Sequence, residues 1–208
     1  MSRLVEGFRL PHAVAGHPAL ELCNTRAIWW TPAPIEYLHD YATLVVLARE
    51  LGVLTPDETV ALRAADRADP ATGFEVLQQV LRLRSDVYAA VAREPDPEAQ
   101  ENVRRRVLEA IRLSTYRPLQ DGRLGLDGGC GLGVPLHRFA LAAHDLLTQH
   151  GPAEVARCMG DACGWVFLDP SHRRRWCVMA VCGNRAKVKR YAERRRAALG
   201  VSASAPAG

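Results

Sequence analysis

Long apolar runs are missing from this sequence of 208 residues. No stretch approaches the roughly 18 apolar residues that a membrane-spanning helix needs. The first ten residues include Arg3, Glu6 and Arg9, which interrupt the apolar core that a secretory signal peptide would require. We therefore expect a cytoplasmic location and no membrane partner, in a compartment where thiols stay reduced.

Motifs of common enzyme classes are also missing. The sequence contains no G-x-S-x-G nucleophile motif and no Walker loop, and no dinucleotide fingerprint follows a predicted strand. The glycines between positions 122 and 133 lack the lysine of a phosphate-binding loop. We expect a protein that is not an enzyme. An enzyme acting on a small molecule, with a purely structural C-terminal part, stays open as an alternative.

Cysteine is sparse, with six residues in all, yet four of them cluster near the C-terminal end. Cys158 and Cys163 form one C-x4-C pair, and Cys177 and Cys182 form a second after a 13-residue loop. A structural Zn2+ site needs four ligands and leaves no open position for water. Two pairs that are each close in sequence bring four thiolates together at a small cost in chain entropy. Two disulfides are the alternative, and a reducing compartment disfavours them.

Acidic residues are scarce in the same region. Residues 157–208 hold 11 Lys and Arg against three acids, a net charge of +8, so residues 1–156 carry the remaining 16 basic and 20 acidic residues, a net of −4. This division indicates that only the C-terminal part binds a polyanion.

The basic residues of this part fall into two groups. The first group precedes the third cysteine and the second follows the fourth, on a helix predicted over about 183–199 with Val188 and Tyr191 packing on the zinc site. We expect both groups to contact DNA, mainly through phosphates, with Asn184 and Arg185 as candidates for reading bases. The candidate DNA-binding residues are Arg173, Arg174, Arg175, Asn184, Arg185, Lys187, Lys189, Arg190, Arg194, Arg195 and Arg196. Binding to RNA or the ribosome stays open as an alternative.

The residues around the cysteines resemble a known family. The segment Cys158-x4-Cys163-Gly-Trp-Val-Phe-Leu-Asp, followed by Arg-Arg-Trp-Cys177-x-Met-x-x-Cys182-Gly-Asn-Arg-Ala-Lys-Val, is similar to the bacterial CGNR zinc finger. Proteins of that family join the finger to an N-terminal ABATE domain and are regarded as transcription regulators, some of them linked to stress. The resemblance implies that the four cysteines carry zinc and that the residues around Cys182-Gly-Asn-Arg185 contact DNA.

The periodicity of the chain predicts an α+β protein: a mostly helical N-terminal domain with a small antiparallel sheet (residues 1–152), a treble-clef-like zinc finger (153–199) and a disordered tail (200–208). Helices are expected over 34–51, from Thr55-Pro56 onward, and over 74–93, 98–115 and 134–149. Short strands are expected over 8–10, 19–23 and 164–168, the last returning through 174–176, with a hairpin within 118–133.

A ligand site is expected where the strand predicted over 19–23 ends. Glu21, Asn24, Thr25 and Arg26 supply polar side chains there and resemble the opening Leu-x-x-Asn-Thr of the family's N-terminal domain. If this domain senses a small-molecule effector, these residues are the candidates to bind it. A homodimer is also expected, because a single finger gives modest affinity for DNA and two fingers would engage paired half-sites.

Overall fold

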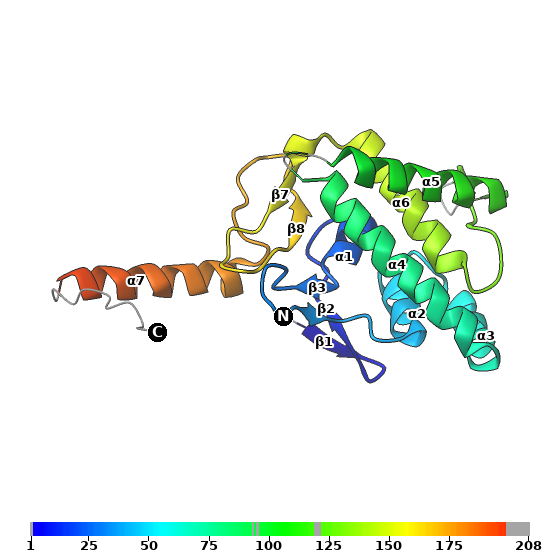
Figure 1. Cartoon of the computed structure of the whole chain (residues 1–208), viewed down its shortest axis with the longest axis horizontal. Coiled ribbons are helices and arrows are strands. Elements are labelled where there is room, and N and C mark those ends of the chain that lie inside the picture. Colours follow the sequence, from blue (N-terminus) through cyan, green and yellow to red (C-terminus); the bar gives the residue numbers. More distant parts are fainter. Residues whose placement is uncertain (1, 93, 95, 119–121, 199–208) are drawn as a thin grey trace.

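The computed structural model describes residues 2–92, 94, 96–118 and 122–198 (Figure 1). The tail expected to be disordered lies outside these residues. A compact body holds the N-terminal part and both cysteine pairs, and one helix extends from it as an arm (Figure 1). None of the described helices is long and apolar enough to cross a bilayer.

Six helices build most of the body. They are α1 (Pro18–Cys23), α2 (Tyr41–Glu50), α3 (Pro56–Ala68), α4 (Pro70–Ala90), α5 (Pro97–Leu113) and α6 (Val134–Gln149). Their starts follow from local chemistry: the side chains of Asp40, Asp69 and Asp96 accept hydrogen bonds from first-turn amides, and Thr55 forms a capping box with Glu58. Helix α4 packs on α1, α5 and α6, and its apolar stripe lies in the centre of the core.

The strands form four separate antiparallel pairs among the described residues. They are β1 (Ser2–Val5) with β2 (Phe8–Pro11), β3 (Arg26–Ala27) with β4 (Ile35–Glu36), β5 (Tyr116–Pro118) with β6 (Leu124–Leu126), and β7 (Val155–Arg157) with β8 (Val166–Leu168). The predicted α+β class is confirmed, with the small sheet divided into these pairs.

Two elements differ from the sequence-based prediction. The strand predicted over 19–23 is helix α1, whose five residues from Ala19 to Cys23 are all buried, so no polar face reveals a helical period. The helix predicted over 34–51 begins only at Tyr41, because Asp40 caps it and Ile35–Glu36 pair with β3 instead.

The C-terminal part contains a 3-10 turn η1 (Pro152–Glu154), the pair β7–β8, a π-helical turn η2 (Met179–Gly183) and helix α7 (Asn184–Ala198). Strand β8 pairs with β7, in the register Ala156 opposite Phe167, and not with residues 174–176 as predicted. The first cysteine pair therefore lies in the loop of a β-hairpin, with β7 before Cys158 and β8 after Cys163 in the sequence.

The finger and the N-terminal part share one core. Trp165 is 2% exposed and Phe167 is fully buried, and both belong to the same cluster of buried side chains as the helices. The side chain of Asn24, also fully buried, accepts a hydrogen bond from the Val166 amide and donates one to the Val166 carbonyl, each at 2.9 Å. Asn24 thus pairs with β8 as a neighbouring strand would, and Tyr88 adds a hydrogen bond from its hydroxyl to the Gly164 carbonyl at 2.8 Å.

We predict that Asn24→Ala lowers the free energy of unfolding by about 2–6 kcal/mol, because it leaves two buried backbone groups of Val166 without partners, at about 1–3 kcal/mol each. Urea unfolding of the zinc-loaded chain measures this. Asn102→Ala is the matched control, because the Asn102 amide is only part-buried and donates to the Asp86 carboxylate at 3.1 Å. Equal stability of the two variants would contradict a structural role for Asn24.

Candidate metal centre and nucleic-acid surface

The first cysteine pair is held by the hairpin loop between β7 and β8. The amide of Cys158 donates to the Trp165 carbonyl at 2.8 Å, and the amide of Cys163 donates to the Gly160 carbonyl at 3.1 Å, which closes a tight turn. Gly164 follows with a φ of +71°, where a Cβ would lie 2.6 Å from the Trp29 ring. Glycine is therefore required at this position both by the backbone and by the packing.

The second pair spans the π-helical turn η2. The amides of Cys182 and Gly183 both donate to the Val178 carbonyl, at 2.9 and 3.4 Å, so the turn carries one residue more than an α-helical turn. The Cys177 amide donates to the sulfur of Cys158 at 3.3 Å, which links the two pairs directly.

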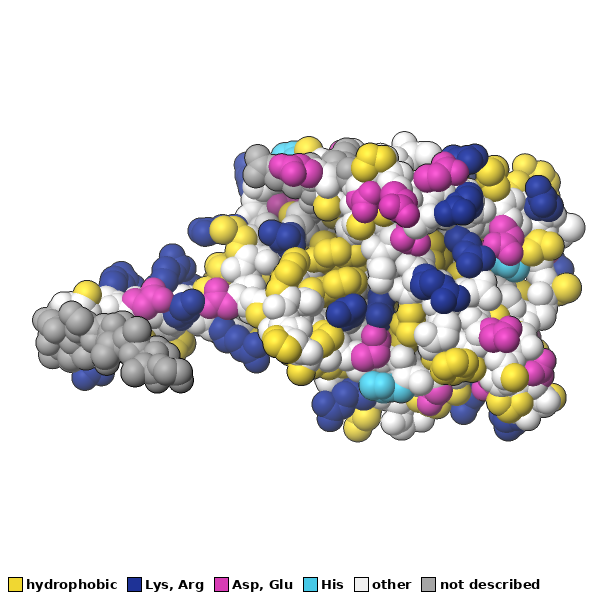
Figure 2. Space-filling view, viewed as in Figure 1, with side chains coloured by type: hydrophobic (Ala, Val, Ile, Leu, Met, Phe, Trp, Pro, Cys, Tyr) yellow, Lys and Arg dark blue, Asp and Glu magenta, His cyan; other side chains and the backbone are white. Residues whose placement is uncertain are grey.

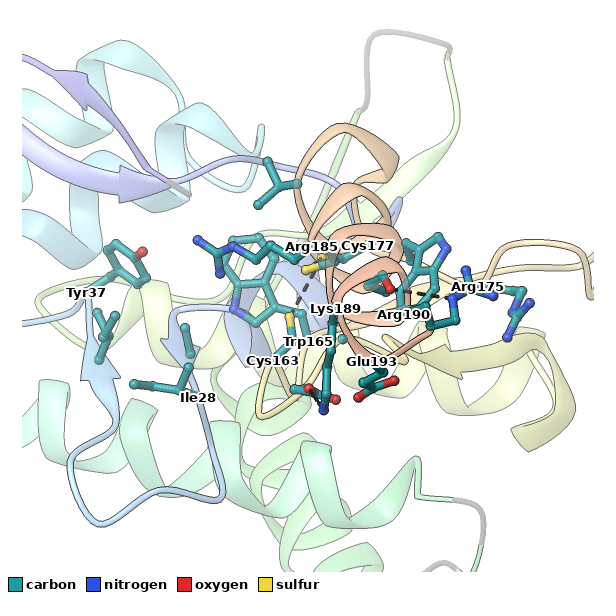
Figure 3. Close-up of a pocket in the computed structure, with 18 residues that line it drawn as sticks. Ile28, Tyr37, Cys163, Trp165, Arg175, Cys177, Arg185, Lys189, Arg190 and Glu193 are labelled. Carbon is teal, nitrogen blue, oxygen red and sulfur yellow. Dashed lines mark hydrogen bonds and ion pairs between the residues drawn. The ribbon is translucent and has the colours of Figure 1, made fainter. Parts of the chain in front are cut away.

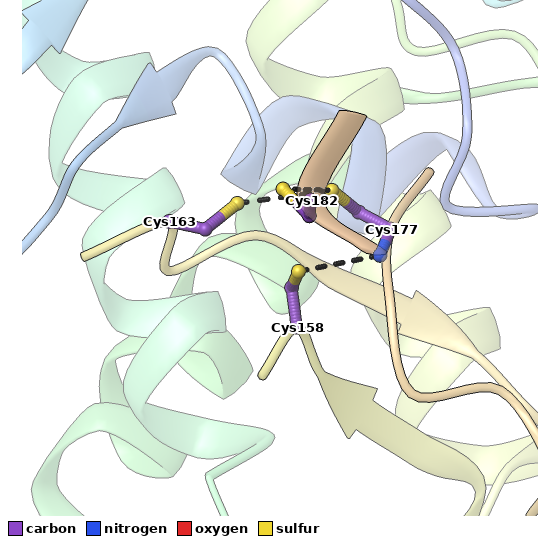
Figure 4. Close-up of side chains that lie close together, drawn as sticks. All are labelled: Cys158, Cys163, Cys177 and Cys182. Carbon is purple, nitrogen blue, oxygen red and sulfur yellow. Dashed lines mark hydrogen bonds between the residues drawn. The ribbon is translucent and has the colours of Figure 1, made fainter. Parts of the chain in front are cut away.

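The four sulfurs converge on one point (Figure 4). All four lie within 4.8 Å of one another, with 3.7 Å between Cys163 and Cys177 and 3.5 Å between Cys177 and Cys182. A tetrahedron with Zn–S bonds of about 2.3 Å places its sulfurs about 3.8 Å apart, whereas a disulfide requires about 2.05 Å. The arrangement fits a zinc ion bound by four cysteines, and His172 is not part of the cluster.

The pKa values of the four thiols also indicate that the cluster needs a bound cation. Hydrogen bonds from Cys163 and Cys177 lower the pKa of the Cys158 thiol, whereas the hydrogen bonds to Cys158 raise the pKa values of Cys163 and Cys177, and burial raises that of Cys182. One thiolate is thus favoured, and further thiolates repel it. Four thiolates at neutral pH need a dication to compensate them, so metal binding must release protons.

The predicted DNA-binding residues before Cys177 have different surroundings. The Arg174 guanidinium donates to the carbonyls of Val14 at 2.8 Å and of Trp176 at 3.1 Å, and it lies 4.0 Å from the centre of the Phe167 ring. Arg174 therefore holds the finger to the N-terminal part. Arg173 and Arg175 are exposed, and Arg175 lies over Trp176 at 5.7 Å.

The predicted DNA-binding residues after Cys182 all lie on α7. This helix leaves the body as an arm with dark-blue basic side chains along it (Figure 2). Among residues 184–197 only Ala186 is half-buried and every other one is exposed, so the prediction that Val188 and Tyr191 pack on the zinc site is wrong. Seven Lys and Arg against the single acid Glu193 give the helix a net charge of +6. One ion pair, between Lys189 and Asp161 at 2.5 Å, ties it to the finger, and the pair is exposed enough to contribute little.

Asn184 begins α7 with helical dihedral angles, because η2 runs directly into this helix. Its side chain donates to the Ala180 carbonyl at 3.0 Å and does not cap the helix N-terminus. The side chain is exposed, as is that of Arg185 one position later.

The residues expected to bind an effector line the junction between the two parts of the chain. Thr25 donates to the Leu22 carbonyl at 2.6 Å and accepts from Arg84 at 2.9 Å, and the Arg26 carbonyl accepts from the Trp165 indole at 3.2 Å. Glu21 accepts from the Ala15 amide at 2.5 Å, and burial raises the pKa of its carboxyl group. Asn24 and the Arg26 carbonyl therefore join the finger to the helices, whereas Glu21 and Thr25 hydrogen-bond within the N-terminal part. A ligand contact by them stays a prediction.

Sequence reasoning missed the partner that orders this junction. The guanidinium of Arg84, 3% exposed, donates to both carboxylate oxygens of Glu36 at 2.7 Å as well as to Thr25. One signal was available: Arg84 continues the apolar stripe of Leu77, Val80 and Val87 on α4, where a charged residue must have a buried partner.

We predict that the purified chain binds one zinc ion, and that Cys158→Ser abolishes stoichiometric binding because a hydroxyl is a poor ligand for zinc. The variant should also lose the near-ultraviolet circular dichroism of Trp165 and Trp176, which the metal holds in place. Elemental analysis and dichroism measure the two effects. Cys130→Ser is the matched control, because Cys130 is exposed and lies outside the cluster. Full zinc content in Cys158→Ser would contradict the assignment.

Comparisons with known proteins agree with this architecture. The family model for the CGNR zinc finger matches residues 154–195, which include all four cysteines and most of α7. The ABATE family model, described as "Putative stress-induced transcription regulator", matches residues 16–150. A search of curated proteins found none that matches the chain. Because the ABATE match covers more than half of the 208 residues, the chain belongs to the ABATE family and carries a CGNR zinc finger at its C-terminal side.

Proposed function

We propose that this protein is a transcription regulator that binds DNA through α7, oriented by a zinc ion at the four cysteines. The observation that supports this most is the isolation of α7: the helix has a net charge of +6 and projects from the body, and residues 184–197 bury almost none of their surface. A helix of this length spans about 22 Å and is narrow enough to enter a major groove. Repulsion among its cations disfavours the free helix, and phosphates would relieve that repulsion.

The cations lie on more than one side of the helix. Arg185, Lys189 and Arg196 share the side near the finger, because their spacing of four and seven residues returns to one face. Lys187 and Arg194, seven residues apart, share the opposite side. We assign the opposite side to the phosphate backbone, because no ion pair there involves either residue among the described parts of the chain.

Specific reading of bases would come from the first turn of α7. Asn184 and Arg185 are exposed there, and their side chains can pair with adenine and guanine respectively. Asn184 would first have to release the Ala180 carbonyl. Backbone contacts would therefore supply most of the affinity, and two copies of the chain on paired half-sites would add to it.

We predict that Lys187→Ala with Arg194→Ala weakens binding to duplex DNA and lowers the slope of log affinity against log salt by about 2, because each phosphate contact contributes about 0.9. Fluorescence anisotropy across a salt series measures both. The control is Arg104→Ala with Arg105→Ala, which removes the same charge from α5, where Arg104 pairs with Glu101 at 2.7 Å.

An equal loss in both double variants would show that net charge alone acts, and would contradict a specific role for α7. Competition between duplex DNA and a structured RNA at matched salt decides between the two polyanions. Preference for RNA would replace this proposal with the RNA-binding alternative.

A further inference from the structure

A cavity of about 630 Å3 lies between the β3–β4 hairpin, the zinc site and the first turns of α7 (Figure 3). This volume is within the range of sites for small organic ligands. The cavity joins three segments that are far apart in the sequence, and it differs in place from the buried residues Glu21, Asn24 and Thr25, which do not line it. A bound zinc ion would occupy only its sulfur end.

One wall of the cavity is apolar. It is formed by Ala27, Ile28, Ile35, Tyr37, Trp165 and Val181. Ile35 is 47% exposed, whereas Ala27, its partner on β3, is 9% exposed. An apolar side chain left uncovered on a concave surface is what a ligand with an apolar body would cover.

Ile28 gives a second, independent indication. Its φ is +50°, a conformation that is strained for a β-branched residue. A hydrogen bond from its amide to the Cys163 carbonyl at 3.1 Å holds it there and ties this wall to the first cysteine pair. Strained residues of this kind concentrate at binding sites, where the surrounding structure fixes them.

The opposite wall is cationic, with Arg175, Arg185, Lys189 and Arg190 from the finger and α7. Lys189 is paired with Asp161, and Arg175 lies over Trp176. The acid Glu193 lines the same wall and acts on Lys189, whose pKa is raised mainly by Asp161 and also by Glu193. Among the described residues Arg175, Arg185 and Arg190 have no acidic partner on this wall. Of these, Arg185 extends its side chain toward the side where Tyr37 and Ile28 lie (Figure 3).

The metal centre adds negative charge to the same cavity. Four thiolates with Zn2+ carry a formal charge of −2, but they occupy the end of the cavity near Cys163, Cys177 and Cys182. The Arg185 side chain begins near this end and extends toward the side where Tyr37 and Ile28 lie, so an anion bound to its guanidinium would lie between the sulfurs and the apolar wall (Figure 3). The planar fork of a guanidinium fits a carboxylate with two parallel hydrogen bonds.

We propose that this cavity binds a small monoanionic ligand with a flat apolar body, an aromatic carboxylate in its simplest form. The carboxylate pairs with Arg185, and the ring lies against Ile28, Ile35 and Tyr37. Because we propose that Arg185 reads a DNA base, the ligand competes with that base for this guanidinium and also fixes α7 against the hairpin. The effect on DNA rests on the proposed function, whereas binding in the cavity does not.

The test is calorimetric titration of the zinc-loaded full chain with benzoate, 2-naphthoate and indole-3-acetate, without DNA. At least one of the three is expected to bind at one site per chain, and its uncharged amide is expected to bind at least tenfold more weakly. Arg185→Ala should lose at least tenfold in affinity for the acid. Arg196→Ala is the matched control, because Arg196 shares this face of α7 but does not line the cavity.

A variant of the apolar wall gives a second reading. Ile35→Asp adds a negative charge beside the ligand and should abolish binding, whereas Ile111→Asp, at a similarly exposed position on α5, should not. No saturable binding by any of the three acids would overturn the proposal. So would equal affinity for acid and amide, or unchanged affinity in Arg185→Ala.

The same preparations are then titrated with duplex DNA in the presence and absence of the bound acid. A severalfold loss of DNA affinity with ligand present supports the coupling. Ligand binding in a chain that does not bind DNA would overturn the proposed function and leave the cavity assignment standing. DNA binding without ligand binding would do the reverse.

Discussion

Four sulfurs held within 4.8 Å of one another impose an electrostatic constraint that the whole C-terminal part must satisfy. As thiols they share protons through hydrogen bonds, and as thiolates they repel one another unless a dication lies between them. The cluster joins the hairpin loop to the π-helical turn, and α7 follows that turn directly, so the position of α7 relative to β7 and β8 depends on it. A metal ion bound by these sulfurs would therefore fix the direction in which the basic helix leaves the body.

The finger is integrated into the protein and is not an appended module. Asn24 supplies a strand-like pair of hydrogen bonds to Val166, Arg174 returns to the Val14 carbonyl, and Trp165 reaches the Arg26 carbonyl. The contacts of Asn24 and Arg26 fall on the stretch that the sequence indicated as a ligand site. Polar residues after a buried segment can bind a ligand or a neighbouring backbone, and here the side chain of Asn24 hydrogen-bonds to the backbone of β8.

The parts of the fold that sequence patterns predicted are those governed by local chemistry. Helix α6 has the expected bounds because an apolar period is enclosed by Gly133 and His150, and the Thr55 capping box fixes the start of α3. The cysteine spacing predicted the cluster for the same reason. Helix α1 and the junction between the finger and the helices were not predicted, because both depend on partners that are distant in the sequence. Helix α1 is buried on all sides, so its sequence shows no amphipathic period. The junction uses backbone groups of β8, and any residue type carries such groups.

The extra residue in the π-helical turn has a geometric consequence for α7. Each residue of an α-helix advances by about 100° around the axis, so one residue more or fewer before Asn184 would rotate every following side chain by that angle. With the turn Met179–Gly183 as it is, Arg185 faces the hairpin and Lys187 faces away from it. The five residues of this turn therefore set the rotation of α7 about its own axis, although only Val181 and Cys182 among them line the cavity. Deleting one residue from the turn would rotate the basic side chains to another side of the helix without altering the charge of α7.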